Sequence, residues 1–151
     1  MTGQPPAGAF WGKLARDATG AVTAWHPLHD HCADVAACCE VLLQHTILRR
    51  RLGYLAGHLL TDVHIARLCV LAALHDIGKH NHGFQHKALL KAPFTAGHVR
   101  EVLALFDPNV EEAHTLFCDS LPVEEFYTWA EEDGAVRLLI AAIGHHGAPQ
   151  K

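Results

Sequence analysis

Apolar residues recur along most of the chain with the three- and four-residue spacing of one helix face, and no segment alternates strictly as a half-exposed strand does. The spacing predicts helices over residues 29–50, 61–76, 97–106, 122–133 and 134–147. We therefore expect an all-α fold, an orthogonal bundle of about five to seven helices around a single core.

Capping signals refine these predicted helices. Thr61 is a suitable N-cap for a helix that we expect to stop at Gly78, and Pro122 is expected at the first position of its helix. For the helix over 29–50, the period of 3.6 residues predicts an inward face made of His31, Val35, Cys38 and Leu42.

The chain length predicts one domain, spanning 10–151, after a flexible lead-in of residues 1–9 that contains two Pro and two Gly. The longest apolar run, 68–74, is too short to cross a bilayer, and the N-terminus shows no signal-peptide pattern. The five Cys lack C-x-x-C spacing, which favours reduced, buried thiols over disulfides or a zinc site. We expect a cytoplasmic protein without membrane contact.

The formal net charge of −4 does not predict a nucleic-acid binder. The charges are also unevenly distributed along the chain. The segment 101–133 holds ten acidic residues and no Lys or Arg, so we expect a solvated face turned away from any phosphate backbone. Fourteen His is the unusual count in this composition. The question is which of them converge.

Two apolar runs end in metal-capable side chains beside glycine, LAALHDIG (71–78) and LLIAAIGHHG (138–147). Consecutive helical residues point about 100° apart, so each pair could touch two adjacent ions, and we expect both helix ends to meet at one site. The alternative for His75 and Asp76 is a helix end with His75 capping carbonyls. The Asp76 carboxylate follows a buried helical turn and therefore needs a partner for its charge, either Lys79 or a bound cation.

Other His are weaker candidates when each is taken alone. His31 is expected to point inward with Asp34 orienting it, although a core histidine bonded to a carbonyl is the alternative. His98 is expected at a helix N-terminus, where the macrodipole keeps the ring neutral as a metal ligand must be; an exposed helix-start His is the alternative. The adjacent His145 and His146, flanked by glycines, are hard to explain by packing.

The order H…HD-x-GK…H…HH resembles the HD nuclease domain at the N-terminus of the CRISPR-associated nuclease-helicase of type I systems. The resemblance covers residues 10–147 and rests on FWGKL (10–14), WHPLHDHCADVAA (25–37), LAALHDIGKHNHGFQHK (71–87), FTAGHVRE (94–101) and GHHG (144–147). It implies the HD-domain helical bundle and metal-dependent cleavage of single-stranded DNA in antiviral defence. Cleavage would be endonucleolytic, then exonucleolytic when a helicase feeds the strand, and the other implied partner is the CRISPR surveillance complex.

The resemblance also implies two metal sites that share one carboxylate. The first would use His31, His75 and Asp76, and the second Asp76, His98, His145 and His146. Asp76 and Lys79 would be the catalytic residues, Lys79 facing the scissile phosphate. The cofactor would be one or two divalent transition-metal ions, Mn, Ni, Co or Fe, with Mg in some members, because imidazole-rich sites suit first-row transition metals. Trp11, Trp25 and Phe84 could stack on bases, with the core as their alternative place.

One departure from the family pattern concerns a closing Asp that should follow the HH pair. The chain stops at Lys151 without it and without the helicase, so it is either a fragment truncated at its C-terminus, which we favour, or a stand-alone protein with a deficient first metal site. We expect it to bind one metal ion well at most and to have weak or no nuclease activity alone. Two alternatives stay open. One is an HD phosphohydrolase acting on nucleotides or cyclic dinucleotides, although the G-Y-P element of the cyclic-dinucleotide branch is absent after His146. The other is an inactive adaptor for a CRISPR complex.

Overall fold

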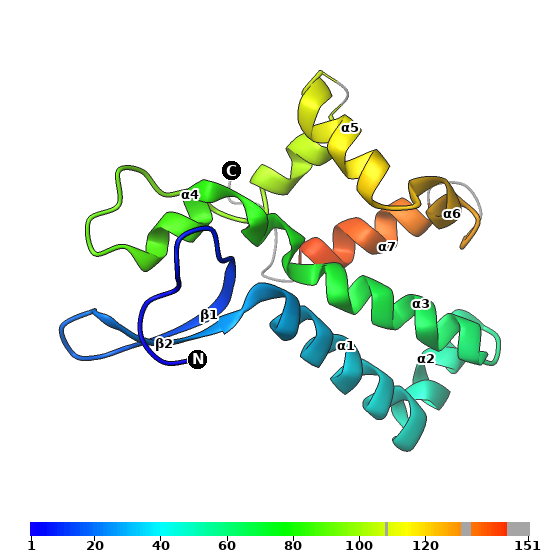
Figure 1. Ribbon diagram of the computed structural model, residues 1–151. Helices are drawn as coiled ribbons and strands as arrows, with labels where there is room; N and C mark the ends of the chain where they lie inside the picture. Colours follow the sequence, from blue (N-terminus) through cyan, green and yellow to red (C-terminus); the bar gives the residue numbers. More distant parts are fainter. Residues whose placement is uncertain (108, 131–133, 145–151) are drawn as a thin grey trace.

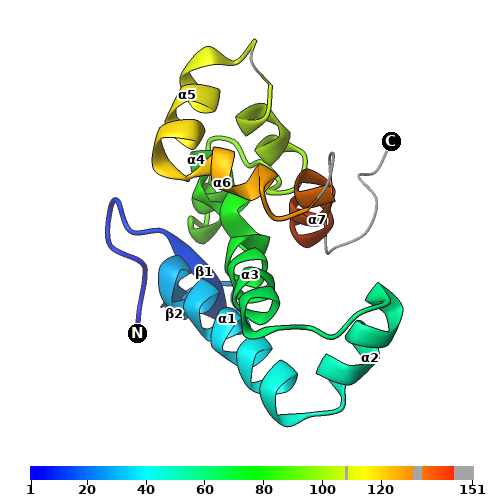
Figure 2. The same ribbon diagram turned by 90° about the vertical axis from the view of Figure 1, so that its right-hand side faces the viewer.

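The computed structural model describes residues 1–107, 109–130 and 134–144 of the chain (Figure 1). The elements in chain order are β1 (Trp11–Arg16), β2 (Val22–Pro27), α1 (Leu28–His45), α2 (Leu48–Ala56), α3 (Asp62–Ala73), the 3₁₀ helix η1 (Leu74–His80), α4 (His82–Gln85), η2 (His86–Ala88), η3 (Glu101–Leu105), α5 (Glu111–Ser120), α6 (Val123–Tyr127) and α7 (Gly134–Ile143). Figures 1 and 2 show α3 between α1 and α7, with the hairpin of β1 and β2 at the end of α3 that leads into η1.

The expected all-α fold is wrong, because β1 and β2 form a two-stranded antiparallel sheet in an otherwise mostly helical chain. Its turn is held by Asp17, whose Oδ1 accepts hydrogen bonds from the backbone N–H of Thr19 at 2.8 Å and of Ala21 at 3.1 Å. Gly20 follows with a φ of 83°, a conformation that glycine adopts without strain. Register shifts near both ends of β1 disturb the alternation that would have revealed the strands.

The helix expected over 29–50 is divided into α1 and α2, and its inward face differs from the prediction by one position. Leu28 and Leu43 are the buried residues of α1, whereas Cys38 and Leu42 are exposed. The actual stripe runs through residues 28, 32, 35, 39 and 43 toward α3. Periodicity alone did not distinguish these two adjacent faces because apolar residues occupy both.

α3 begins as predicted. The Thr61 side chain accepts from the backbone N–H of His64, and the His64 ring accepts from the backbone N–H of Thr61, so a capping box starts the helix. The α-helix ends at Ala73, earlier than expected, and the chain continues as the tighter η1. Asp76 interrupts that turn with φ −108° and ψ 16°, which sets its side chain apart from the helix.

The second half of the chain supplies the larger core. Val102 from η3, Phe126 from α6 and Leu139 and Ile143 from α7 pack with Leu71 of α3. The helices here are shorter than predicted, since η3 starts only at Glu101 and α6 ends at Tyr127, with Pro122 as its N-cap rather than its first residue. Every Asp and Glu that is described between residues 101 and 130 is exposed, as expected for a solvated face.

A smaller core joins the hairpin to α4. Trp11, Trp25, Phe84 and Ala88 are buried together, with Leu14 packed against them. The three aromatic residues therefore take the core alternative rather than stacking positions for bases. The five Cys are free thiols as expected, but none is buried: Cys38 and Cys118 are exposed and the other three are half-buried, so the expectation of buried thiols is wrong. No helix in the described part of the chain is long and apolar enough to span a bilayer.

Candidate metal centre

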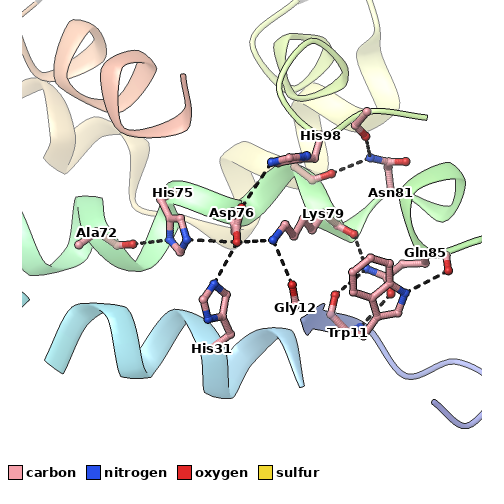
Figure 3. A network of polar contacts seen from close by, with 12 residues as sticks. Trp11, Gly12, His31, Ala72, His75, Asp76, Lys79, Asn81, Gln85 and His98 are labelled. Atoms are coloured by element: carbon pink, nitrogen blue, oxygen red, sulfur yellow. Dashed lines mark hydrogen bonds and ion pairs between the residues drawn. The ribbon is translucent and has the colours of Figure 1, made fainter. Parts of the chain in front are cut away.

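Asp76 is the centre of a buried polar cluster. Its side chain is only 1 % exposed although it carries a carboxylate. The Lys79 Nζ lies 2.6 Å from Oδ2, and the Nε2 atoms of His75 and His31 lie 3.1 and 3.2 Å from the same oxygen (Figure 3). The Nε2 of His98 faces Oδ1 at 3.5 Å.

These side chains come from three distant parts of the sequence. His31 is in the first turn of α1, His75 and Asp76 belong to η1, and His98 precedes η3. The ligand atoms of His31, His75 and Asp76 all lie within 4.8 Å of one another, close enough for one ion to touch all three. A single small cation is the simplest ligand for such a group.

The hydrogen bond of His75 determines which of its nitrogens can bind a cation. Its Nδ1 lies 2.7 Å from the carbonyl oxygen of Ala72, and a carbonyl can only accept. Nδ1 therefore carries the proton, and in the neutral ring Nε2 presents a lone pair toward Asp76 Oδ2, which is itself an acceptor. A metal ion between these two atoms would resolve the contact, and a carbonyl behind the ring is a common way of orienting a metal-binding His.

Electrostatics favour a neutral His31 beside an ionised Asp76. Burial lowers the pKa of His31, Lys13 lowers it further, and the attraction of Asp76 only partly opposes this. For Asp76, burial acts to raise the pKa, but the hydrogen bond and charge of Lys79 together with His75 and His98 outweigh it, so the pKa of Asp76 is lowered. His31 and Asp76 thus provide the neutral imidazole and the ionised carboxylate that metal binding requires.

Lys79 lies inside this cluster rather than at its mouth. Its side chain is 6 % exposed, and Nζ also donates to the carbonyl oxygen of Gly12 at 3.0 Å. The sequence left Lys79 or a cation as alternative partners for Asp76, and in this structure Lys79 is bonded to it. A phosphate approaching from solvent would not meet its ammonium group directly.

Gly78 and Asn81 place His98 against η1. A Cβ atom at Gly78 would lie 1.8 Å from the carbonyl oxygen of His98, so only glycine permits this approach. The Asn81 Nδ2 donates to the carbonyl oxygens of Gly78 at 2.6 Å and Gly97 at 2.8 Å. His98 is thereby held without the predicted helix N-terminus, since the residues before Glu101 are not helical.

The hairpin is fastened to the same place by Gln85. Its Oε1 accepts from the backbone N–H of Trp11 at 2.8 Å, and its Nε2 donates to the carbonyl oxygens of Trp11 at 3.1 Å and Lys79 at 2.7 Å (Figure 3). A Cβ at Gly12 would lie 2.8 Å from the His31 Cβ, so the strand passes close to α1. Sequence reasoning missed Gln85 and Gly12, and only their place inside the quoted motifs could have pointed to them.

The remaining predicted residues have mixed outcomes. Asp34 does not contact His31 and instead lies 3.0 Å from His26 Nε2. His145 and His146 lie outside the described residues. The described end of α7 does approach the cluster, because Ile143 packs with Leu71 in the core that also includes Ile77, next to Asp76. Three imidazoles and one carboxylate fit a first-row transition metal better than Ca²⁺, which prefers oxygen ligands.

Comparisons with known proteins agree with this arrangement. A family model described as "Cas3, HD domain" matches residues 11–151, nearly the whole chain. Neither the curated proteins nor the solved structures gave a significant match. Because the family match includes the hairpin, the HD pair of η1 and the segment of His98, this chain belongs to the family of Cas3 HD domains, the HD nuclease domain of type I CRISPR systems.

Proposed function

We propose that this domain cleaves single-stranded DNA by metal-dependent phosphodiester hydrolysis, with a helicase and the CRISPR surveillance complex as its partners in antiviral defence. His31, His75 and Asp76 would hold a first divalent transition-metal ion. Asp76 and His98 would contribute to a second, together with His145 and His146. The family supports a nuclease, and the donor atoms around Asp76 support the metal.

The observation that carries this proposal is the contact between His75 Nε2 and Asp76 Oδ2. Two acceptors lie 3.1 Å apart in a buried place while the opposite nitrogen of the ring is committed to the Ala72 carbonyl. The ligand atoms of His31, His75 and Asp76 all lie within 4.8 Å of one another, so a single cation could contact all three side chains.

The chain's own groups would act mainly by position and charge. Asp76 stays ionised at neutral pH because its pKa is lowered, and His31 stays neutral because burial lowers its pKa. The Ala72 carbonyl fixes the ring of His75, and Gly78 lets His98 approach the other carboxylate oxygen. When bound, a divalent ion would supply an activated water and neutralise charge on the phosphodiester.

A cleavage assay tests the proposal. Circular single-stranded DNA and a panel of nucleotides would be incubated with the protein and Mn²⁺, Ni²⁺, Co²⁺ or Mg²⁺. We expect metal-dependent nicking of the circle and its loss in Asp76→Ala. Asp119→Ala serves as the matched control, because that carboxylate is exposed on α5.

The other outcomes assign the alternatives. Phosphate release from nucleotides without nicking would favour the nucleotide phosphohydrolase, and no reaction with either substrate would favour the adaptor. Elemental analysis adds an independent check, since we expect a transition-metal ion bound to the wild-type protein and lost in Asp76→Ala. Equal metal content in the two proteins would contradict the proposed site.

A further inference from the structure

Lys13 lies on the face of the hairpin that is turned toward the metal centre. Lys13 pairs with His26 across the sheet, and paired residues have side chains on the same face. The ring of His26 lies 6.2 Å from that of His31, which identifies this face as the one beside the cluster. The next residue, Leu14, packs into the opposite, apolar face with Trp11.

The ammonium group of Lys13 is available in this position. Lys13 is exposed, and among the ion pairs of the described residues the Lys and Arg members are Arg49 and Lys79. Two carboxylates of α1 face histidines, Asp30 with His29 at 3.1 Å and Asp34 with His26 at 3.0 Å.

The backbone around Lys13 is rigidly held. Trp11 is bound by Gln85 through three hydrogen bonds and buried in the smaller core. The Gly12 carbonyl accepts from Lys79, whose Nζ also bonds Asp76. The site thus contains one lysine that is buried and engaged, and a second that is exposed on a strand fixed beside it.

We propose that Lys13 binds a backbone phosphate of the single strand next to the phosphate that is cleaved. This inference rests on the proposed nuclease function and names a contact that positions its substrate. The scissile phosphate would lie at the metal ligands, whereas Lys13 stands outside them on the hairpin. A compact ammonium on a flexible stem suits a backbone phosphate of any sequence.

Binding of fluorescent oligothymidylate, measured by anisotropy in chelator-treated buffer, tests this contact without turnover. We expect Lys13→Gln to weaken binding about fivefold and to reduce the slope of log affinity against log salt by about 0.7, the value for one phosphate contact on a single strand. Lys13→Arg should retain most of the affinity. Lys91→Gln is the matched control, because Lys91 is also exposed and makes no ion pair among the described residues.

Two further readouts separate substrate binding from structural damage. Ni²⁺ affinity by calorimetry and Mn²⁺-dependent hydrolysis of bis(p-nitrophenyl) phosphate, which has no neighbouring phosphate, should stay within about threefold of wild type in Lys13→Gln. Unchanged DNA affinity and salt slope would overturn the inference, as would a parallel loss of Ni²⁺ binding or ester hydrolysis. If the wild-type protein binds DNA through Lys13 but hydrolyses neither substrate with any metal, the proposed function fails and the contact stands.

Discussion

Asp76 and Lys79 form a buried ion pair whose two members depend on each other. The Asp76 side chain is 1 % exposed and that of Lys79 6 %. Burial acts to raise the pKa of Asp76, and the hydrogen bond and charge of Lys79 reverse that effect. The ammonium therefore keeps the Asp76 carboxylate ionised inside the protein and at the same time ties η1 to the hairpin through Gly12.

Replacement of Lys79 tests this dependence. We expect Lys79→Met to lower the free energy of unfolding of the metal-free protein at pH 7.5 by about 3 kcal/mol, because a buried carboxylate loses its charge partner. Urea denaturation followed by circular dichroism measures the change. Lys91→Met, at an exposed site, should cost less than about 0.5 kcal/mol. Equal unfolding midpoints for the two variants would show that the pair contributes nothing to stability.

At the scale of elements, the end of α3 is shaped to bring another segment close. The α-helix tightens into η1 after Ala73, and Gly78 lies where the backbone of His98 crosses. Asn81 joins the same crossing by donating to both Gly78 and Gly97. Gly78 thus determines whether the His98 side chain can reach Asp76.

A methyl group at this crossing should therefore be costly. In Gly78→Ala the new Cβ would lie 1.8 Å from a backbone oxygen of His98, so the segment must move. We expect the free energy of unfolding to fall by about 3 kcal/mol and Ni²⁺ affinity to drop with it. Gly97→Ala is the control, since its Cβ would meet the end of the flexible Glu101 side chain at 2.7 Å. A larger loss in the control would contradict this account.

In the whole molecule, the cluster lies where α1, η1 and the segment of His98 meet. His31 comes from α1, which carries the hairpin, and the described end of α7 reaches η1 from the opposite side through Ile143. An ion held by His31, His75 and Asp76 would join α1 to η1. Metal binding should therefore raise the free energy of unfolding of the whole domain as well as order the residues around the ion.

Thermal unfolding with and without Ni²⁺ measures this coupling. At pH 7.5 and a free concentration one hundred times Kd, we expect about 2.7 kcal/mol of stabilisation and a higher Tm. Imidazoles bind metal only when deprotonated, so metal affinity falls as pH drops through their pKa values. Because the pKa of His31 is lowered from 6.5, protonation of His31 contributes to this loss of affinity only below pH 6.5. The Tm shift should vanish near pH 5 and after addition of a chelator. An unchanged shift at pH 5 would exclude a His-rich site.

Features that depend on short-range order can be predicted from the amino-acid sequence alone. The spacing of apolar residues and the cap at Thr61 predicted α3, and the HD pair at its end was singled out from fourteen His by its local setting. The ordered motifs also identified the family, which the family model confirms. These features are legible because helix periodicity and caps are properties of neighbouring residues.

Which polar groups are buried together depends on the three-dimensional packing of the chain. It brought His31, His75 and His98 to one carboxylate, and their role as metal ligands stays a prediction. It also revealed a hairpin that periodicity did not show, a helix face displaced by one residue and a buried Lys79. Burial and charge partners depend on contacts between segments far apart in the chain, and local spacing does not specify those contacts.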